Sequence, residues 1–277
     1  MLQVEATGRS EAGPHRETNE DSIGAFEPDE VSGIDRRGYL YVVADGLGGH
    51  QAGEIASSTA VSTLRDEYYA ATGHVRIEPA LRRAVQAANL RVHNLGQRHA
   101  EYRAMCTTLT TVALVGECSY IAHIGDSRAY HWRDGQFRLL TSDHSEAAEL
   151  VRMRVLRPDK VRDHPGRNVL TRTIGTTLIS RPDFIRQPLS AGDRFLLCSD
   201  GLWSEVDDAE LAEVVGDCSP AEACRALIDL VLARGCPDNV SLQVVHVLGV
   251  SPDERRAGSR MSWLSGMFAR GAPRPPG

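Results

Sequence analysis

The sequence contains no apolar run long enough to cross a lipid bilayer. Its longest apolar stretches, such as YLYVVA and RFLLC, fall far below the roughly 18 residues that a membrane-spanning helix needs. The first residues, MLQVEATGRSEAGPHRE, also lack the apolar segment of a secretory signal peptide. We therefore expect a cytoplasmic protein without a transmembrane segment.

Cysteine pairs of the kind that bind zinc are also missing. The six cysteines include no CxxC pair, and no histidine stands at zinc-finger spacing. A disulfide framework is typical of much shorter secreted chains. We therefore expect the cysteines to be buried, reduced thiols.

Positive charge is not in excess. The 31 Lys and Arg residues are outnumbered by 37 Asp and Glu residues, which gives a net charge of -6. A protein that binds duplex nucleic acid needs a basic surface to neutralise the phosphates, so no nucleic-acid partner is expected. The chain is 42% apolar and 25% charged, a composition typical of folded soluble domains.

Two familiar phosphate-binding motifs and one hydrolase motif are absent as well. In DGLGGHQAGE, Glu54 stands where a P-loop requires lysine, and Gln51 interrupts the dinucleotide pattern GxGxxG. No GxSxG nucleophile elbow occurs. The glycines of this stretch are therefore interpreted as positions of close backbone packing at the start of a helix.

The strands and helices that the sequence does predict come in blocks. Apolar periodicity predicts strands and then helices in the first third of the chain, at 2–9, 22–27, 39–44, 54–69 and 81–95. Next, four apolar stretches at hairpin spacing predict an antiparallel meander, namely TTLTTVALV, SYIAHIG, RAYHW and QFRLL. Asp134-Gly135 would form its last turn.

The second half of the chain repeats this block order. Residues 145–175 are mixed and charged and are predicted to form a surface excursion. They are followed by a strand, two helices and a final strand, at DRFLLCS, 207–215, 219–234 and NVSLQVVHV. Such blocks favour an α+β fold with antiparallel sheets over a doubly wound parallel sheet.

The length of 277 residues suits one large domain. We expect this domain to cover residues 1–249. Residues 250–277 are rich in Ser, Gly, Pro and Arg and are predicted to form a disordered tail. Within the tail, a few apolar side chains would share one face of a short helix suited to a membrane surface or a partner groove, namely Trp263, Leu264, Met267 and Phe268.

Acidic residues fall at the ends of the predicted strands. Asp45, Asp126 and Asp200 directly follow strands, whereas Asn19-Glu20-Asp21 and Asp238-Asn239 precede them. In an antiparallel sheet the end of one strand and the beginning of its neighbour share a rim, so all these sites can converge. Each one alone is explained by turn formation. Their number favours a common site.

A convergent acidic cluster needs cations. Two carboxylates 4 Å apart repel by about 4 kcal/mol at an effective dielectric constant of 20. Oxygen ligands without His or Cys favour hard ions such as Mg²⁺ or Mn²⁺, and Gly46 would let its backbone carbonyl approach an ion closely. Arg16, five residues before Asp21, has a guanidinium suited to two oxygens of a phosphoryl group. The combination indicates phosphate chemistry.

Six segments between residues 3 and 247 carry a family resemblance. They are HRETNEDS, VVADGLGGHQAGE, CTTLTTVAL, AHIGDSRAYHWRDGQFRLLTSDHS, HPGRNVLTRTIGT with FLLCSDGLW, and CPDNVSLQVV. In the sequence and the order of these segments, the chain resembles the bacterial metal-dependent protein serine/threonine phosphatases of the type 2C class, the PPM family. The resemblance implies a four-layer α-β-β-α sandwich with two central antiparallel sheets, and two Mn²⁺ or Mg²⁺ ions at one end.

The resemblance also implies roles for single residues. Asp21 and Asp45 would ligate the metals, with Asp45 bridging the two ions and Gly46 contributing its carbonyl. Asp200 and Asp238 would complete the shell of the second ion. Asp126 would hold a weaker third ion together with Asp200.

Further roles concern residues around the ions. Glu20 would act through a metal-bound water, and Asn239 would stand behind the ligands. Arg16 would bind the phosphate of the substrate. Residues 144–167 match the mobile flap of such enzymes.

The chain departs from the family at two positions. Leu47 stands where eukaryotic relatives have a histidine proposed as general acid. A metal-bound water is then a better candidate for the proton donor than His50, which is equally well explained as a structural residue. Ser204 stands where several relatives have an acid, which predicts a weaker third ion.

The resulting hypothesis is hydrolysis of phosphoserine and phosphothreonine in one step. A water bridging the two ions would attack phosphorus in line, and no covalent phosphoenzyme would form. Expected partners are phosphorylated proteins, among them a Ser/Thr kinase or its substrates, and the chain is expected to be a monomer. Two alternatives remain open: a non-catalytic sensor or binding module on the same scaffold, and a hydrolase of small phosphoesters.

Overall fold

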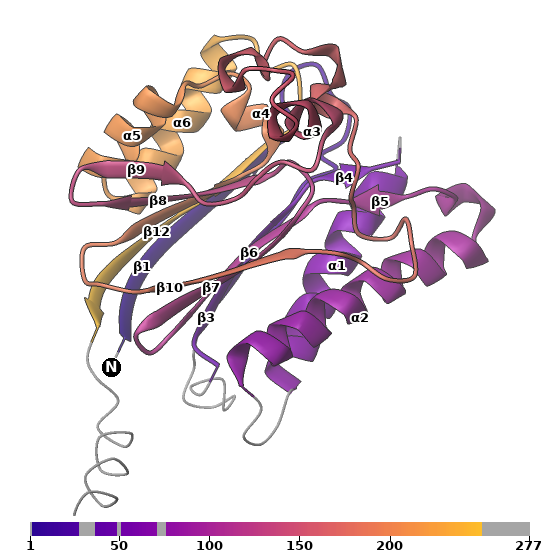
Figure 1. Cartoon of the computed structure of the whole chain (residues 1–277), viewed down its shortest axis with the longest axis horizontal. Coiled ribbons are helices and arrows are strands. Elements are labelled where there is room, and N and C mark those ends of the chain that lie inside the picture. The colour runs from indigo at the N-terminus through magenta and orange to yellow at the C-terminus, as the bar shows by residue number, and fades with distance from the viewer. Residues whose placement is uncertain (1, 28–36, 49–50, 71–75, 251–277) are drawn as a thin grey trace, which may run out of the picture.

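Two five-stranded antiparallel sheets form the centre of the computed structural model, which describes residues 2–27, 37–48, 51–70 and 76–250 (Figure 1). One sheet contains, in spatial order, β1 (Leu2–Glu11), β12 (Val240–Val250), β11 (Arg194–Cys198), β8 (Arg128–Arg133) and β9 (Gln136–Leu139). The other contains β10 (Asp183–Pro188), β7 (Cys118–Ile124), β6 (Leu109–Val115), β3 (Tyr39–Ala44) and β2 (Ser22–Phe26). A short third sheet pairs β4 (Gly46–Leu47) with β5 (Cys106–Thr107).

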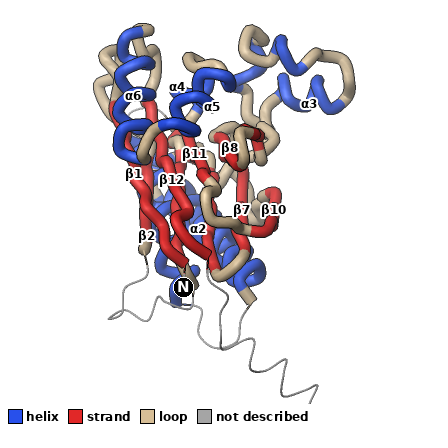
Figure 2. Tube along the Cα trace, turned by 90° about the vertical axis from the view of Figure 1, so that its left-hand side faces the viewer, coloured by secondary structure: helices blue, strands red, loops and turns tan. Residues whose placement is uncertain are grey.

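Helices cover both outer faces of the pair of sheets. Against the second sheet pack α1 (Gln51–Ala70) and α2 (Ile77–Arg98), and against the first pack α4 (Asp200–Trp203), α5 (Asp208–Asp217) and α6 (Pro220–Ala233). The remaining helix, α3 (Glu146–Arg152), lies with short 3-10 turns in a segment that projects beyond the sheets (Figure 2). In the described part of the chain, no helix combines the length and apolarity needed to span a membrane.

The alternation of side chains along β3 explains the layers. Leu40 and Val42 are buried in the cluster shared with α1 and α2, whereas Tyr41 and Val43 are buried in the cluster between the two sheets. Because both faces of β3 are covered, its sequence YLYVVA is apolar at nearly every position. The predicted α-β-β-α sandwich with two central antiparallel sheets is confirmed.

The predicted hairpin turn is also confirmed, but the predicted meander is wrong. Asp134 and Gly135 connect β8 to β9 with φ angles of 51° and 76°, as expected for a type I′ turn. The four strands of the expected meander, however, are split between the two large sheets: β6 and β7 belong to one, β8 and β9 to the other. The chain changes sheets at residues 125–127, where turn residues alone do not reveal which sheet receives the next strand.

Other sequence predictions hold with shifted boundaries. Helix α1 begins at Gln51 rather than residue 54, and α2 extends beyond 81–95 on both sides. Strand β10, at the edge of its sheet, was not predicted. All six cysteines are free, as expected, but the prediction that they are buried is wrong for three of them, which are partly exposed. The expected apolar face at Trp263 lies outside the described residues, and so does the predicted tail except for Val250, which still belongs to β12.

Candidate active site

The acidic residues expected at strand ends meet at one rim of the sandwich, the end that carries β4 and α4 (Figure 1). Asp45 follows β3 and Asp126 follows β7, while Asp200 is the first residue of α4 directly behind β11. Asp21 precedes β2 and Asp238 precedes β12. The structure therefore brings together carboxylates from five distant parts of the sequence, as expected for strand ends that share one rim of antiparallel sheets.

Asp21 is buried with one oxygen left without a partner. Its Oδ2 accepts a hydrogen bond of 2.8 Å from Ser199 Oγ, but no described group bonds to its Oδ1. Burial is the main cause that raises the pKa of Asp21 to about 7, and the charges of Asp200 and Asp238 add to it. A buried carboxylate oxygen without a donor is a position where a cation would be stabilised.

Asp45 and Asp200 share a hydrogen bond between their side chains and are both partly buried. Burial raises the pKa of Asp45 well above its usual value, and the charges of Asp21, Asp200, Asp126 and Asp238 raise it further. The pKa of Asp200 is raised to about 6, first by burial and then by Asp238. Carboxylates that repel one another in this way would be stabilised by a cation bound between them.

The backbone next to Asp45 is packed so closely that only glycine fits. A Cβ atom on Gly46 would lie 2.1 Å from Gly53 O, and one on Gly53 would lie 2.0 Å from Glu20 Oε2. Gly46 N also donates to Glu20 O at 3.2 Å. Close packing at the start of α1 is therefore confirmed for Gly53, whereas Gly49 lies outside the described residues. The contacts of Gly46 and Gly53 place Glu20 directly against the Asp45-Gly46 turn.

The side chain of Asn239 connects the HRETNED segment to the start of β12 through hydrogen bonds. Its Oδ1 accepts from Glu20 N at 2.9 Å, and its Nδ2 donates to Ala12 O and Thr18 O at 2.8 and 3.0 Å. The side chain of Asn239 is thus fully engaged with backbone groups behind the carboxylates. The supporting role of Asn239 stays a prediction.

Arg16 lies at the edge of the acidic cluster. Its Nη2 is 2.8 Å from Asp238 Oδ1, and its side chain is 49% exposed. The positive charge of Arg16 lowers the pKa of Asp200, which places the guanidinium close enough to act on the centre of the cluster. The predicted phosphate-binding residue is therefore at the site and open to solvent.

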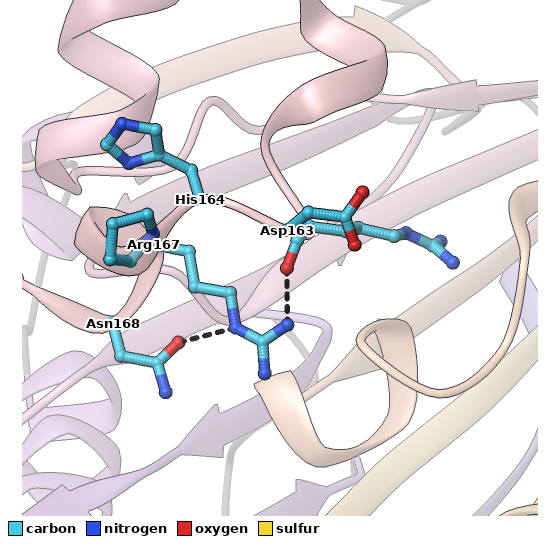
Figure 3. Close-up of a pocket in the computed structure, with 6 residues that line it drawn as sticks. Asp163, His164, Arg167 and Asn168 are labelled. Atoms are coloured by element: carbon cyan, nitrogen blue, oxygen red, sulfur yellow. Dashed lines mark hydrogen bonds between the residues drawn. The ribbon is translucent and has the colours of Figure 1, made fainter.

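A second arginine near the cluster was not singled out by the sequence analysis. Arg167 also lowers the pKa of Asp200, and its Nη1 donates to Arg162 O. It lines an open cleft of about 370 Å³ in the projecting segment (Figure 3), together with Arg162, Asp163, His164, Pro165 and Asn168. The sequence signal was weak, because no spacing in HPGRNVL relates Arg167 to the distant Asp200.

Asp126 is buried and is anchored through its backbone. It is 4% exposed, and its backbone oxygen accepts a hydrogen bond of 2.9 Å from the indole nitrogen of Trp203. Burial is the main cause that raises its pKa, followed by the charges of Asp200 and Asp143. Trp203 ends the same short helix that Asp200 begins, so Asp126 and Asp200 are linked through α4.

The two departures from the family pattern lie at this rim as well. Leu47, on β4 beside Gly46, is 36% exposed and carries no group that can donate a proton. Ser204 follows Trp203 and donates to Glu205 Oε1 at 3.4 Å. His50 lies outside the described residues.

The donor set fits hard divalent ions. Among residues 2–27, 37–48, 51–70 and 76–250, no three His, Cys, Asp or Glu side chains already form the shell of a single ion. Magnesium-type ions do not require such a preformed shell, because they keep several waters in their coordination sphere. The unpartnered Asp21 Oδ1 and the raised pKa values of Asp21, Asp45, Asp126 and Asp200 are the features expected of carboxylates that share such ions.

Comparison with known proteins agrees with this site. The family model described as "Protein phosphatase 2C" matches residues 16–228. Protein phosphatase PhpP of Streptococcus pneumoniae is 34% identical over 244 residues, which cover 86% of this chain and 95% of that protein. The structure is similar to the serine/threonine phosphatase PstP/Ppp of Mycobacterium tuberculosis, with a TM-score of 0.80 and 32% identity over 90% of this chain and 100% of that one.

A further similar structure is recorded with metal. It is the catalytic domain of the serine threonine protein phosphatase PstP in complex with two manganese ions, with a TM-score of 0.78, 32% identity, and coverage of 90% of this chain and 100% of that chain. The family match runs from Arg16 into α6, so it includes Asp21, Asp45, Asp126 and Asp200 and ends before Asp238. This chain belongs to the protein phosphatase 2C family.

Proposed function

We propose that the chain is a protein serine/threonine phosphatase that depends on Mn²⁺ or Mg²⁺. The observation that carries the proposal is the meeting of Asp21, Asp45, Asp200 and Asp238 at one rim, where burial and mutual repulsion raise the pKa values of the first three. Folding such a cluster is unfavourable unless the charges are compensated. Family membership over residues 16–228 supports the same activity.

The proposed ligands divide between two ions. Asp21, Asp45 and the carbonyl of Gly46 would hold one ion, while Asp45, Asp200 and Asp238 would hold the other. Asp126 and Asp200 would hold a weaker third. When bound, such ions lower the pKa of water and neutralise charge on the phosphoryl oxygens.

Arg16 would orient the phosphoryl group of the substrate. Its guanidinium is half exposed, and Asp238 holds it at the edge of the cluster. A planar guanidinium can donate to two phosphoryl oxygens at once, which fixes the orientation of the phosphorus atom. Glu20 and Asn239 would keep the segment with Arg16 and Asp21 in place, since Asn239 Oδ1 accepts from Glu20 N.

The proton for the departing serine or threonine oxygen would come from water. Leu47 occupies the position of the proposed histidine acid and cannot donate. With no histidine in that place, no imidazole pKa near 6.5 should limit the leaving-group step.

The proposal extends to the partners. The substrates would be phosphorylated proteins, among them a Ser/Thr kinase or the proteins that it modifies. A monomeric state and a cytoplasmic location stay predictions from the sequence.

Hydrolysis of a phosphothreonine peptide with and without Mn²⁺ tests the proposed function. We expect phosphate release that requires the ion, and a loss of at least about 10² in rate on Asp45→Asn, because a central electrostatic group is removed. No release at saturating Mn²⁺ would instead favour a non-catalytic sensor module. Faster turnover of small phosphoesters than of phosphopeptides would favour a small-molecule hydrolase.

A further inference from the structure

His144 forms two hydrogen bonds with Gly125, the residue that precedes Asp126. The ring and backbone of His144 are fully buried. Its backbone N–H donates to Gly125 O at 2.7 Å, and its ring Nδ1 accepts from Gly125 N at 3.1 Å. Both backbone polar groups of Gly125 are therefore bonded to a single residue that lies 19 positions further along the chain.

The hydrogen bonds of His144 determine which ring nitrogen carries the proton. Since Nδ1 accepts from Gly125, the proton of the neutral ring is on Nε2, which donates to Asp183 Oδ2 at 3.2 Å. Burial lowers the pKa of His144, and the neighbouring ring of His123, 4.8 Å away, has a pKa lowered to about 4 by its own burial. Both rings are thus neutral near pH 7, and the Nδ1 acceptor is maintained.

Gly125 links His144 to Asp126 at a position where the backbone is closely packed and only glycine fits. Its φ angle is 110°, and a Cβ atom there would lie 2.5 Å from Thr108 Cγ2. On the other side, Trp203 Nε1 holds the backbone oxygen of Asp126 at 2.9 Å. Asp126 is therefore fixed from both directions, by His144 through Gly125 and by Trp203 directly.

His144 also closes the base of the projecting segment 145–170. Its backbone oxygen accepts from Thr171 N at 2.8 Å, and the next residue, Ser145, forms a β-bridge with Leu170. Glu146 N donates to Val169 O at 2.9 Å, which continues this pairing. One buried residue thus connects the base of this segment, which carries Arg167, with the turn that carries Asp126.

We propose that His144 is a positioning residue that fixes Asp126 for its ion and couples that ion to the base of segment 145–170. The inference rests on the proposed ion site at Asp126 and deepens it. Residues that orient a ligand from behind typically change metal affinity by about 10- to 100-fold when they are replaced. No hydrogen bond or ion pair among the described residues joins His144 to Asp21 or Asp45, so the ions at Asp45 should be unaffected.

A matched pair of substitutions separates the two sides of the ring. The amide oxygen of His144→Asn would stand near Nδ1 and keep an acceptor for Gly125. The longer side chain of His144→Gln would place its amide near Nε2, so that it keeps the contact with Asp183 and loses the one with Gly125. By isothermal titration with Mn²⁺, we expect His144→Gln to weaken the weakest binding step by about 10- to 100-fold and His144→Asn to stay within about 3-fold of the unsubstituted protein.

The outcomes distinguish this inference from the proposed function. The role of the Gly125 contact is overturned if both variants weaken the weakest Mn²⁺-binding step equally. It is also overturned if His144→Gln leaves the affinity of that step unchanged. In both cases the tightly bound ions, and with them the proposed function, are unaffected. Binding of only two ions by the unsubstituted protein also overturns the role of the Gly125 contact. No Mn²⁺ binding at all by the unsubstituted protein refutes the proposed function itself.

A measurement on the unsubstituted chain covers the case in which a variant fails to fold. In a ¹⁵N NMR titration with Mg²⁺, the resonance of His144 Nδ1 should move with the last binding step, because that ion engages Asp126. A resonance that moves only with the first step, or does not move, would contradict the coupling. Amide resonances in 145–170 should follow the same step.

Discussion

Arg16 and Asp238 form an ion pair with 2.8 Å between Nη2 and Oδ1. The side chain proposed to bind phosphate is thus oriented by a carboxylate proposed to bind metal. Both side chains remain partly exposed, 49% and 35% respectively, so the pair adds little to folding stability. Its value lies in placing a guanidinium at the edge of the acidic cluster before any substrate arrives.

Arg16→Lys should therefore impair catalysis without unfolding the protein. Lysine keeps the charge but loses the planar fork that holds two oxygens, and removal of such a contact commonly costs about 10² to 10³ in rate. Steady-state kinetics on a phosphopeptide would show the fall in kcat/KM, and thermal unfolding should change by less than about 1 kcal/mol. An unchanged kcat/KM would rule out a role of Arg16 in phosphate binding.

Stabilisation by Mn²⁺ should increase with pH between about 5.5 and 7.5. The pKa values of Asp21 and Asp200 are raised from 3.8 to about 7 and about 6, so the folded protein without metal binds more protons than the unfolded chain in this range. Its stability therefore falls as pH rises, while fewer protons compete with the ion. Melting temperatures with and without Mn²⁺ across this range would show a widening gap. A constant gap would mean that these carboxyls do not bind the ion.

Asp21→Asn should stabilise the metal-free protein above pH 7. The substitution removes a buried charge whose raised pKa corresponds to roughly 4 kcal/mol at most, and its amide oxygen can still accept from Ser199. The same variant should lose most of the stabilisation by Mn²⁺, which for the unsubstituted protein is about 2.7 kcal/mol at 100 times the dissociation constant. Denaturant unfolding with and without Mn²⁺ measures both effects. A variant that is less stable without metal and equally stabilised by Mn²⁺ would be inconsistent with the site.

Gly53→Ala should weaken metal binding although alanine normally favours a helix. The new Cβ would lie 2.0 Å from Glu20 Oε2 and 2.8 Å from Gly46 O, so the Glu20 side chain must move and the start of α1 must separate from the Asp45-Gly46 turn. We expect Mn²⁺ affinity to fall by about 10- to 100-fold, measured by titration calorimetry.

Gly135→Ala is the matched control for this substitution. Its Cβ would meet nothing within 4 Å, but its φ of 76° makes alanine unfavourable by about 1–2 kcal/mol. The control should lose stability and keep its affinity for Mn²⁺. If both variants lost affinity alike, general destabilisation rather than the Glu20 contact would be the cause.

The features that could be predicted from the sequence are those that depend on a local pattern of residues. The Asp134-Gly135 turn follows from two residues that tolerate positive φ, and β3 follows from the continuous apolar run YLYVVA. The acidic rim was predictable because strand ends of antiparallel sheets meet, whatever the order of the strands. Asp21, Asp45 and Asp200 were found in this way.

What the sequence did not predict depends on long-range placement. The crossing between sheets at Gly125 was missed because hairpin spacing does not say which sheet the next strand joins. Arg167 affects the pKa of Asp200, and His144 accepts a hydrogen bond from Gly125. The residues of each pair are far apart in the sequence, and no spacing predicts that they meet. Strand β10 was missed because an edge strand with polar residues has no clear apolar period.

Diffraction from crystals soaked in Mn²⁺, recorded at the manganese absorption edge, would show whether the rim carboxylates hold two ions. We expect two strong anomalous peaks on either side of the Asp45 carboxylate, one near Asp21 and one near Asp238. Asp45→Asn crystals treated alike should lose at least one of them. Full-length crystals with an intact Asp45 and no paired peaks at this rim would contradict the account.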